Sequence, residues 1–378
     1  MAAESVQATE SVRALAGADG RARVGRGPWL FSPRVDVCVF LGSALVSLGA
    51  LWVGARLGVL EGESPGWSWV PAVLLVDVAH VWATLFRVYL DGEELRRRLW
   101  LYVLAPTVAY GLGVTLYSES DLLFWRVLAY LAVFHFVRQQ YGWVALYRAR
   151  ANERGRLGRW IDTVAIYMAT VYPLVYWHAH VPRRFWWFLE GDFAALPVVF
   201  ERALRPVYFL SLALYAARSL HGWLVRRRGN PGKDIVVVTT AACWYAGIVA
   251  FNSDYAFTVT NVVIHGVPYM ALVYFYARAR RAELGKTYNL LARGPVAFLL
   301  TLWALAYAEE LLWDRGVWHE RGWLFGAGFD ASSWKLWLVP LLALPQATHY
   351  VLDGFVWRRR GNPNLSLFSD DAPREGKH

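Results

Sequence analysis

Four histidines lie inside long apolar stretches of the sequence: His80, His135, His265 and His349. An ionisable side chain is costly in hydrocarbon, so it normally faces the inside of a helix bundle or a cavity. Each of the four has a polar residue three or four positions away, which places both side chains on one face of a helix. The pairs are Asp77 with His80, His135 with Gln139, Asn261 with His265, and His349 with Asp353.

This spacing is typical of a metal ligand and its support, because a metal-bound imidazole usually donates its second ring nitrogen to a carboxylate or carbonyl oxygen. Imidazole and carboxylate groups suit iron, zinc or copper. The two cysteines, Cys38 and Cys243, lie in separate apolar stretches, which argues against a thiolate cluster or a disulfide framework. We therefore predict one metal site. The predicted ligands are His80, His135, His265 and His349, and the predicted catalytic groups are His265, Asp77 and Asp353.

The four histidines also lie at similar depths along their segments. Counting to the next arginine run gives 16 residues from His80, 13 from His135, 13 from His265 and 9 from His349. At about 1.5 Å per residue these counts correspond to roughly 14 to 24 Å. One layer of a bundle can therefore contain all four.

Other polar residues in these stretches are candidates for supporting roles. We expect Gln139 and Asn261 to support the site, and Arg87, Arg138 and Arg218 to orient a polar end of a substrate or to neutralise carboxylates. Pairing of the arginines with Asp91 or with backbone groups is the alternative. The remaining candidates are expected to be structural or solvated, namely His221 near a membrane surface, His178, His180 and His319 in loops, and Glu309 and Glu310 at a helix end.

The elements that must position these residues are apolar helices. Of the 378 residues, 57% are hydrophobic and 18% are charged, which is typical of a membrane protein. The apolar residues form blocks of about 18 to 25, long enough to cross about 30 Å of hydrocarbon. The sequence thus predicts an all-α, polytopic bundle of about ten transmembrane helices. The expected spans are 37–55, 69–90, 99–117, 122–147, 160–177, 204–225, 235–251, 256–277, 295–312 and 335–357.

The net charge of +10 does not indicate nucleic-acid binding, because the basic residues alternate with the apolar blocks instead of forming one patch. Arginine-rich runs follow every second block, so the positive-inside rule predicts a multi-pass inner-membrane protein with both termini in the cytoplasm. Residues 1–34 are expected to be a disordered cytoplasmic tail, residues 35–358 the transmembrane domain, and residues 359–378 a cytoplasmic C-terminal tail.

A metal held in such an apolar chain is accessible to substrates dissolved in the bilayer. Oxygen-dependent attack on an unreactive lipid or isoprenoid is the chemistry that most needs this arrangement. One histidine per helix and no cysteine ligands resemble the bacterial membrane β-carotene dioxygenases of the bacteriorhodopsin-related-protein type. That architectural resemblance covers the four histidine-bearing helices and implies non-haem iron and oxidative cleavage of a polyene. The clustered histidine boxes of membrane desaturases are absent from the sequence.

Three other classes stay open at this point. An acyltransferase would use His265 as general base beside Asn261 without a metal. A haem protein would use two of the histidines as axial ligands. A proton-coupled transporter would use the Asp, His and Arg residues as a relay.

Overall fold

The computed structural model describes residues 27–61 and 64–358, and among these residues it contains helices and no strand. The chain begins with α2 (Pro33–Asp36), η1 (Val37–Leu41), α3 (Gly42–Arg56), α4 (Gly66–Trp69), η2 (Val70–Val78), α5 (Ala79–Trp82), η3 (Leu85–Tyr89), α6 (Gly92–Arg97), α7 (Leu99–Glu119) and α8 (Asp121–Arg150). It continues with α9 (Arg156–Ala179), α10 (Val198–Leu224), α11 (Pro231–Trp244), η4 (Tyr245–Ala250), α12 (Asp254–Phe257), η5 (Thr258–Val262) and α13 (Val263–Arg280). The last elements are α14 (Lys286–Leu291), α15 (Pro295–Trp313), η6 (Asp314–Trp318), α16 (Gly322–Phe325), η7 (Ser332–Trp334), α17 (Lys335–Leu342) and α18 (Leu344–Val356).

Each of the ten apolar stretches expected from the sequence is mainly helical, although 69–90 and 335–357 are interrupted at Ala83 and Ala343. Six helices are long and apolar enough to cross a membrane by length and composition: Pro33–Arg56, Gly66–Tyr89, Leu99–Glu119, Pro231–Ala250, Asp254–Arg280 and Pro295–Trp318. The described residues are therefore all-helical, and six of their helices could cross a membrane. Length and composition thus support six crossings, whereas the sequence predicted about ten.

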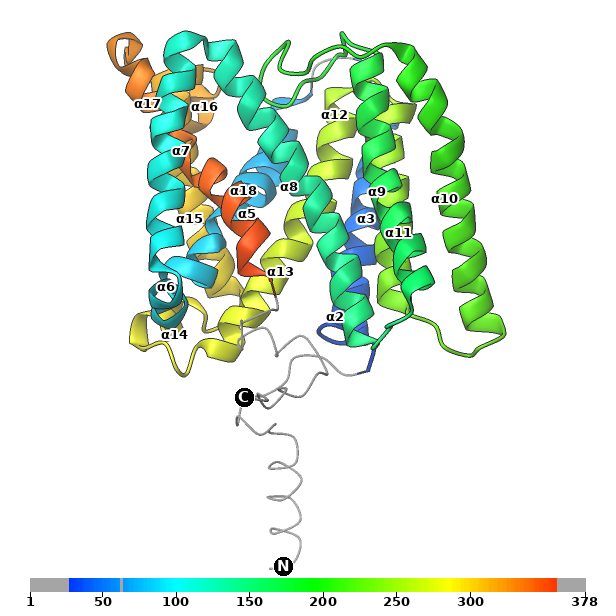
Figure 1. The fold of residues 1–378 in the computed structure, drawn as a ribbon. Helices are drawn as coiled ribbons and strands as arrows, with labels where there is room; N and C mark the ends of the chain where they lie inside the picture. Colours follow the sequence, from blue (N-terminus) through cyan, green and yellow to red (C-terminus); the bar gives the residue numbers. More distant parts are fainter. Residues whose placement is uncertain (1–26, 62–63, 359–378) are drawn as a thin grey trace, which may run out of the picture.

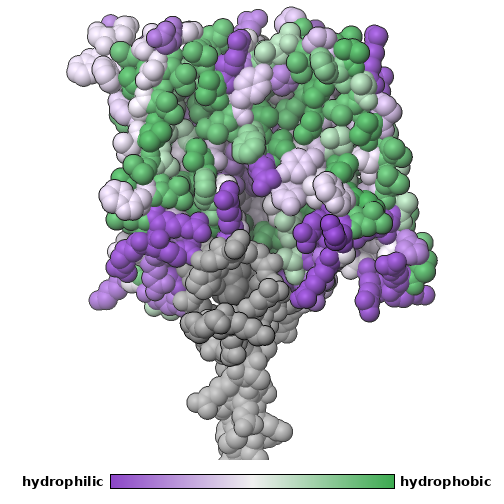
Figure 2. Space-filling view, in the orientation of Figure 1, coloured by the Kyte–Doolittle hydropathy of each residue, from purple (hydrophilic) through white to green (hydrophobic). Residues whose placement is uncertain are grey.

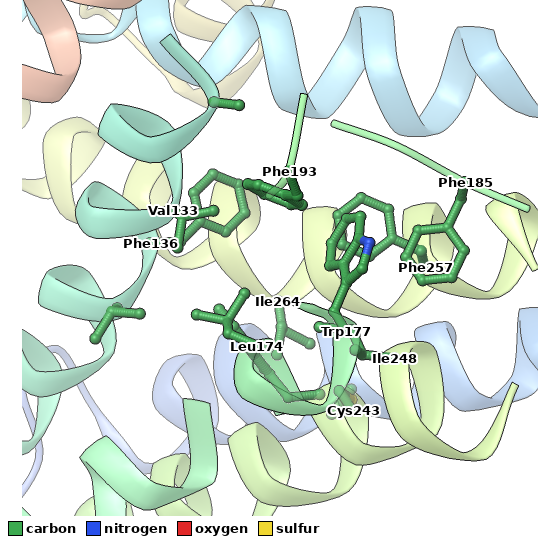
Figure 3. Packing of buried hydrophobic residues seen from close by; sticks show 14 residues of the cluster. Val133, Phe136, Leu174, Trp177, Phe185, Phe193, Cys243, Ile248, Phe257 and Ile264 are labelled. Carbon is green, nitrogen blue, oxygen red and sulfur yellow. The ribbon is translucent and has the colours of Figure 1, made fainter. Parts of the chain in front are cut away.

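The bundle has two flanking groups of helices with α8 and α13 between them (Figure 1). On one side lie α7, α15, α17 and α18, and on the other lie α3, α9, α10 and α11. Within a membrane, lipid is as apolar as the helix surfaces, so van der Waals packing and polar contacts hold the helices together. Figure 3 shows one such contact region, where Phe136 of α8 lies with Trp177 of α9, Phe257 of α12 and the loop residues Phe185 and Phe193.

Basic segments gather at one end of the bundle. In Figure 1, α6, α14 and the α8–α9 and α10–α11 connections all lie at this end. Figure 2 shows hydrophilic residues forming a rim there, below a belt of hydrophobic surface. We call this end of the molecule the basic end.

The helical domain starts earlier than expected. Leu30 and Phe31, which the sequence analysis assigned to a disordered tail, are 0% and 5% exposed. Their backbone N–H groups donate to the Asp36 carboxylate at 2.7 and 3.0 Å. Residues 27–34 therefore belong to the folded domain, and the rest of the two predicted tails, 1–26 and 359–378, lies outside the described residues.

Candidate metal centre

The four predicted histidines converge in the centre of the bundle. His80 is on α5, His135 on α8, His265 on α13 and His349 on α18. Their exposed fractions are 1%, 2%, 0% and 1%. Segments far apart in the sequence thus bring four imidazoles to one buried place, as the depth counts predicted.

All four rings point their Nε2 atoms toward one another. The Nε2–Nε2 distances are 3.1 Å from His265 to His80, 3.2 Å from His265 to His135, and 3.2 Å from His135 to His349. The potential ligand atoms of His80, His135 and His265 all lie within 4.8 Å of one another. His349 joins this compact group through His135, and its ring centroid lies 4.9 Å from that of His80.

These separations fit a shared metal ion. Two nitrogens that each bond a metal at about 2.0 to 2.1 Å and lie 3.1 to 3.2 Å apart subtend an angle of about 100° at the metal. This angle lies between those of octahedral and tetrahedral coordination.

Hydrogen bonding among the imidazoles is a poorer explanation of the same geometry. The three contacts form a chain, His80–His265–His135–His349, in which His265 and His135 each make two. A neutral imidazole carries one N–H, and here it is either on Nε2 or on Nδ1. If His265 accepts from His80 and His135, the single proton of His135 must also serve His349. A central cation instead uses every Nε2 lone pair.

Two of the opposite ring nitrogens, those of His349 and His135, lie near oxygen atoms that favour this use of the lone pairs. His349 Nδ1 lies 2.8 Å from the Thr84 hydroxyl, and His135 Nδ1 lies 3.4 Å from the Asp353 carboxylate. His80 Nδ1 lies 3.7 Å from Asp77, longer than a hydrogen bond. A proton on Nδ1 leaves Nε2 free to bind a metal. The expected pairing of His349 with Asp353 is wrong, because Asp353 lies against His135 on the neighbouring helix.

His265 is held differently from the other three. Gln139 donates to the His265 backbone carbonyl at 3.0 Å, which joins α8 to α13 at the site. Asn261, the expected partner, instead donates to the carbonyl of Phe257 and the hydroxyl of Thr260. Among the described residues, His265 Nδ1 has no hydrogen-bond partner.

Two close contacts around His265 fix its surroundings. The ring of Phe136 stacks on the imidazole with a centroid distance of 3.5 Å. Gly266 allows α13 to approach η2, because a Cβ at this position would lie 2.6 Å from the side chain and 3.1 Å from the carbonyl oxygen of Val76. The helix that carries His80 can therefore lie against the helix that carries His265.

The arginines are occupied elsewhere. Arg87 is fully buried and binds Glu94 at 3.0 Å and the Val356 carbonyl at 2.7 Å. Arg138 is exposed and donates to the hydroxyl of Tyr167, and Arg218 pairs with Asp162 at 2.6 Å. These bonds join neighbouring helices, and none of them goes to one of the four histidines. The contacts of Arg87 and Arg138 therefore indicate a structural role and not the expected substrate-orienting role.

Glu309 and Glu310 are not solvated, contrary to expectation. Their exposed fractions are 5% and 8%, and Trp82 donates to Glu309 at 2.7 Å. The sequence pattern placed them at a helix end, whereas the helix continues through η6 to Trp318. Both carboxyl groups thus lie inside the bundle, with Glu309 bonded to the helix turn that carries His80.

A cavity of about 880 Å³ lies beside the histidines, and its wall includes Phe257 of α12 and Arg321 next to α16. In Figure 1, α12 and α16 lie toward the end opposite α6 and α14. Asp77 and Phe136, which contact His80 and His265, form part of its wall. The rest of the wall combines aromatic and polar side chains, and its aromatic residues are Trp69, Trp125, Phe185, Trp186, Trp187, Phe188, Phe257, Trp313 and Trp318. Polar wall residues include Glu310, Gln346 and Arg321.

Sequence reasoning missed three residues that surround the rings. Thr84 supports His349, and the rings of Tyr269 and Tyr350 lie 5.0 Å from His349 and 5.2 Å from His135, centroid to centroid. Thr84 is four residues after His80 and Tyr269 is four residues after His265, so the same-face rule could have found both. Tyr350 carried no signal apart from being next to His349 in the sequence.

Comparison with known proteins identifies no relative: no family model, no curated protein and no solved structure matches this chain.

Proposed function

We propose that the protein is a membrane-embedded, metal-dependent oxygenase with non-haem iron, acting on a lipid or isoprenoid-type apolar substrate. The observation that carries this proposal is the convergence of four buried imidazole Nε2 atoms at 3.1 to 3.2 Å steps. An apolar residue would be less costly at each of these positions in a membrane. The cluster therefore has a use that outweighs its cost.

In this proposal His80, His135, His265 and His349 hold the ion. Iron would bind and activate dioxygen at the positions that the imidazoles leave open. Thr84 and Asp353 keep the Nε2 lone pairs of His349 and His135 directed inward, and Gln139 fixes the backbone at His265. Zinc and copper also bind imidazole nitrogens. Iron is proposed because it can activate dioxygen for attack on an apolar substrate, and the cavity beside the site could hold such a substrate.

The cavity supports an apolar substrate. The aromatic part of its wall offers flat surfaces for a long hydrocarbon, beside polar and charged residues. Its inner wall includes Phe136, which covers His265, and Asp77, which lies next to His80. A substrate in the cavity would thus lie against residues that contact two of the four proposed ligands.

The geometry weighs against two alternatives. Asn261 makes no bond to His265, so the acyltransferase reading loses the support for its general base. The ring centroids of His265 and His349 lie 4.9 and 4.6 Å from that of His135, and their Nε2 atoms each lie 3.2 Å from His135 Nε2. Such close rings leave no room for a porphyrin between two axial histidines, which weighs against a haem protein.

One observation favours a second candidate, the transport of a metal cation. Asp77 and Glu310 form part of the cavity wall, and carboxylates along a path to buried histidines suit a cation pathway. Uptake of a metal by proteoliposomes without oxygen consumption would favour this candidate over the oxygenase.

The test uses purified protein loaded anaerobically with Fe(II) and supplied with apolar lipid extract. We expect oxygen uptake that depends on both iron and extract and is lost in His135→Ala, whereas His221→Ala, an exposed histidine outside the cluster, retains it. Thr258→Trp should fill part of the cavity and lower oxygen uptake while leaving bound iron unchanged. Equal oxygen uptake by the wild type and His135→Ala would overturn the proposal.

We also propose ten crossings of a cytoplasmic membrane with the basic end inside, because the arginine-rich connections share that end. Reporter fusions after residues 230 and 365 should both give cytoplasmic signals. An external signal from either fusion would contradict this topology.

A further inference from the structure

The segment between α13 and α15 forms a pocket at the basic end that is separate from the metal centre. The pocket has a volume of about 550 Å³ and is lined by Arg281, Lys286, Asn289, Leu290 and Arg293. Three of these five residues are cationic and none is acidic. α14, which contributes Lys286, Asn289 and Leu290, lies at the end of the bundle where the basic connections gather (Figure 1).

The positive charges of this pocket form no salt bridge with the carboxylates of the described residues. The nearby carboxylates of Asp91, Glu93 and Glu283 all pair with Arg280. In the described part of the chain, no ion pair involves Arg281, Lys286 or Arg293. The Arg281 guanidinium donates to the Arg293 backbone carbonyl at 2.9 Å, which closes one side of the pocket and fixes this cation in place.

The pocket is attached firmly to the bundle. Tyr288, in the middle of α14, is 3% exposed, and its hydroxyl donates to the Phe86 carbonyl at 2.9 Å. Ala292 is fully buried in the same hydrophobic cluster. The cations are therefore held on a fixed scaffold, which lowers the entropic cost of binding a ligand.

Apolar surface continues from the pocket toward the hydrophobic belt. Leu290 in the pocket wall is 64% exposed, and Val296 and Leu300 at the start of α15 are 69% and 56% exposed. A ligand that matches both features has an anionic group for the pocket and hydrocarbon for the helix surface. Anionic lipids have this chemistry, and basic clusters next to membrane helices attract them.

We propose that this pocket binds the phosphate of an anionic phospholipid, with Lys286, Arg281 and Arg293 around the phosphate and the acyl chains along α15. Guanidinium groups form paired hydrogen bonds with phosphate oxygens, and Asn289 offers a further donor. The site is independent of the metal and of the proposed oxygenase reaction.

The test compares the double variant Lys286→Gln/Arg293→Gln with the wild type in detergent. Binding is measured by native mass spectrometry against phosphatidylglycerol, phosphatidylcholine and inorganic phosphate. Each basic side chain near an anionic lipid contributes about a fivefold gain in affinity, so the double variant should bind phosphatidylglycerol roughly 25-fold more weakly. Arg226→Gln/Arg228→Gln removes the same charge from exposed positions at the same end of the bundle and should change the affinity little.

Two results would overturn the proposal. An equal loss in the Arg226/Arg228 control would mean that general charge attraction, and no pocket, holds the lipid. Binding of inorganic phosphate as tight as that of phosphatidylglycerol would mean that the pocket binds free phosphate and gains nothing from the acyl chains. Unchanged thermal unfolding of both double variants would show that folding does not confound the comparison.

Discussion

The hydrogen bond between Thr84 and His349 gives the sharpest test of how the site is held. Thr84→Val keeps the shape of the side chain and removes the oxygen that lies 2.8 Å from His349 Nδ1. Because both residues are buried, the ring nitrogen then loses its hydrogen-bond partner, and such a loss costs about 1 to 3 kcal/mol, or roughly 5- to 150-fold. Loss of the partner of a metal-bound histidine typically lowers metal affinity by about 10- to 100-fold. We expect a decrease of this size.

A matched control lies beside His349. Thr348 is 6% exposed, and its hydroxyl has no hydrogen-bond partner among the described residues. Thr348→Val makes the same chemical change at another buried position and breaks no hydrogen bond to a histidine, so it should leave metal affinity nearly unchanged. Competition with a chelator, followed by metal analysis of the retained protein, measures both variants. Equal affinity of Thr84→Val and the wild type would refute the role assigned to Thr84.

Two further predictions concern α8 and the basic end. Gln139→Leu removes the hydrogen bond to the His265 carbonyl, so it should lower metal affinity and also lower the free energy of unfolding by about 1 kcal/mol. Its control, Gln140→Leu, loses a hydrogen bond from Thr240 and should lower the free energy of unfolding alone. The chelator competition and thermal unfolding measure both variants. Burial raises the pKa of Glu153, but Lys233, Asn230 and Arg148 lower it more, so its pKa lies below the ordinary value. Its stabilising contribution is therefore present above about pH 4.3, the unfolded-state pKa, and is lost as the pH falls through the folded-state pKa. Unfolding curves of Glu153→Gln should depend less on pH in this acid range, and an unchanged dependence would contradict the pairing.

The sequence predicted the helical segments and the convergence of the histidines, because both follow from local patterns. An apolar block of membrane length predicts a helix without any knowledge of its neighbours. A histidine in such a block is costly in contact with lipid, so it is expected in the interior of the bundle. His80, His135, His265 and His349 were found in this way, and the structure brings them together. Their identity as metal ligands, and the oxygenase reaction, remain proposals.

Predictions that required knowing which helices are neighbours were less successful. The same-helix rule paired Asp353 with His349, but α18 packs against α8, and the Asp353 carboxylate lies 3.4 Å from His135 Nδ1. Asn261 follows the same rule and turns back to its own helix, while Thr84 reaches across to His349. Arg87 and Arg138 look functional in isolation, yet Glu94 and Tyr167, on other helices, account for them. Cross-helix partners of this kind have no signature in a single sequence.

The central claim is that the four histidines hold one metal ion. Elemental analysis of the detergent-purified protein, combined with X-ray absorption spectroscopy of the bound metal, tests it most directly. The account predicts one iron ion per chain with imidazole nitrogens at about 2.0 to 2.2 Å, and loss of the ion in each single alanine variant of His80, His135, His265 and His349 but not in His221→Ala. Protein that takes up no metal after anaerobic loading, or that retains it in the four variants, would contradict the account.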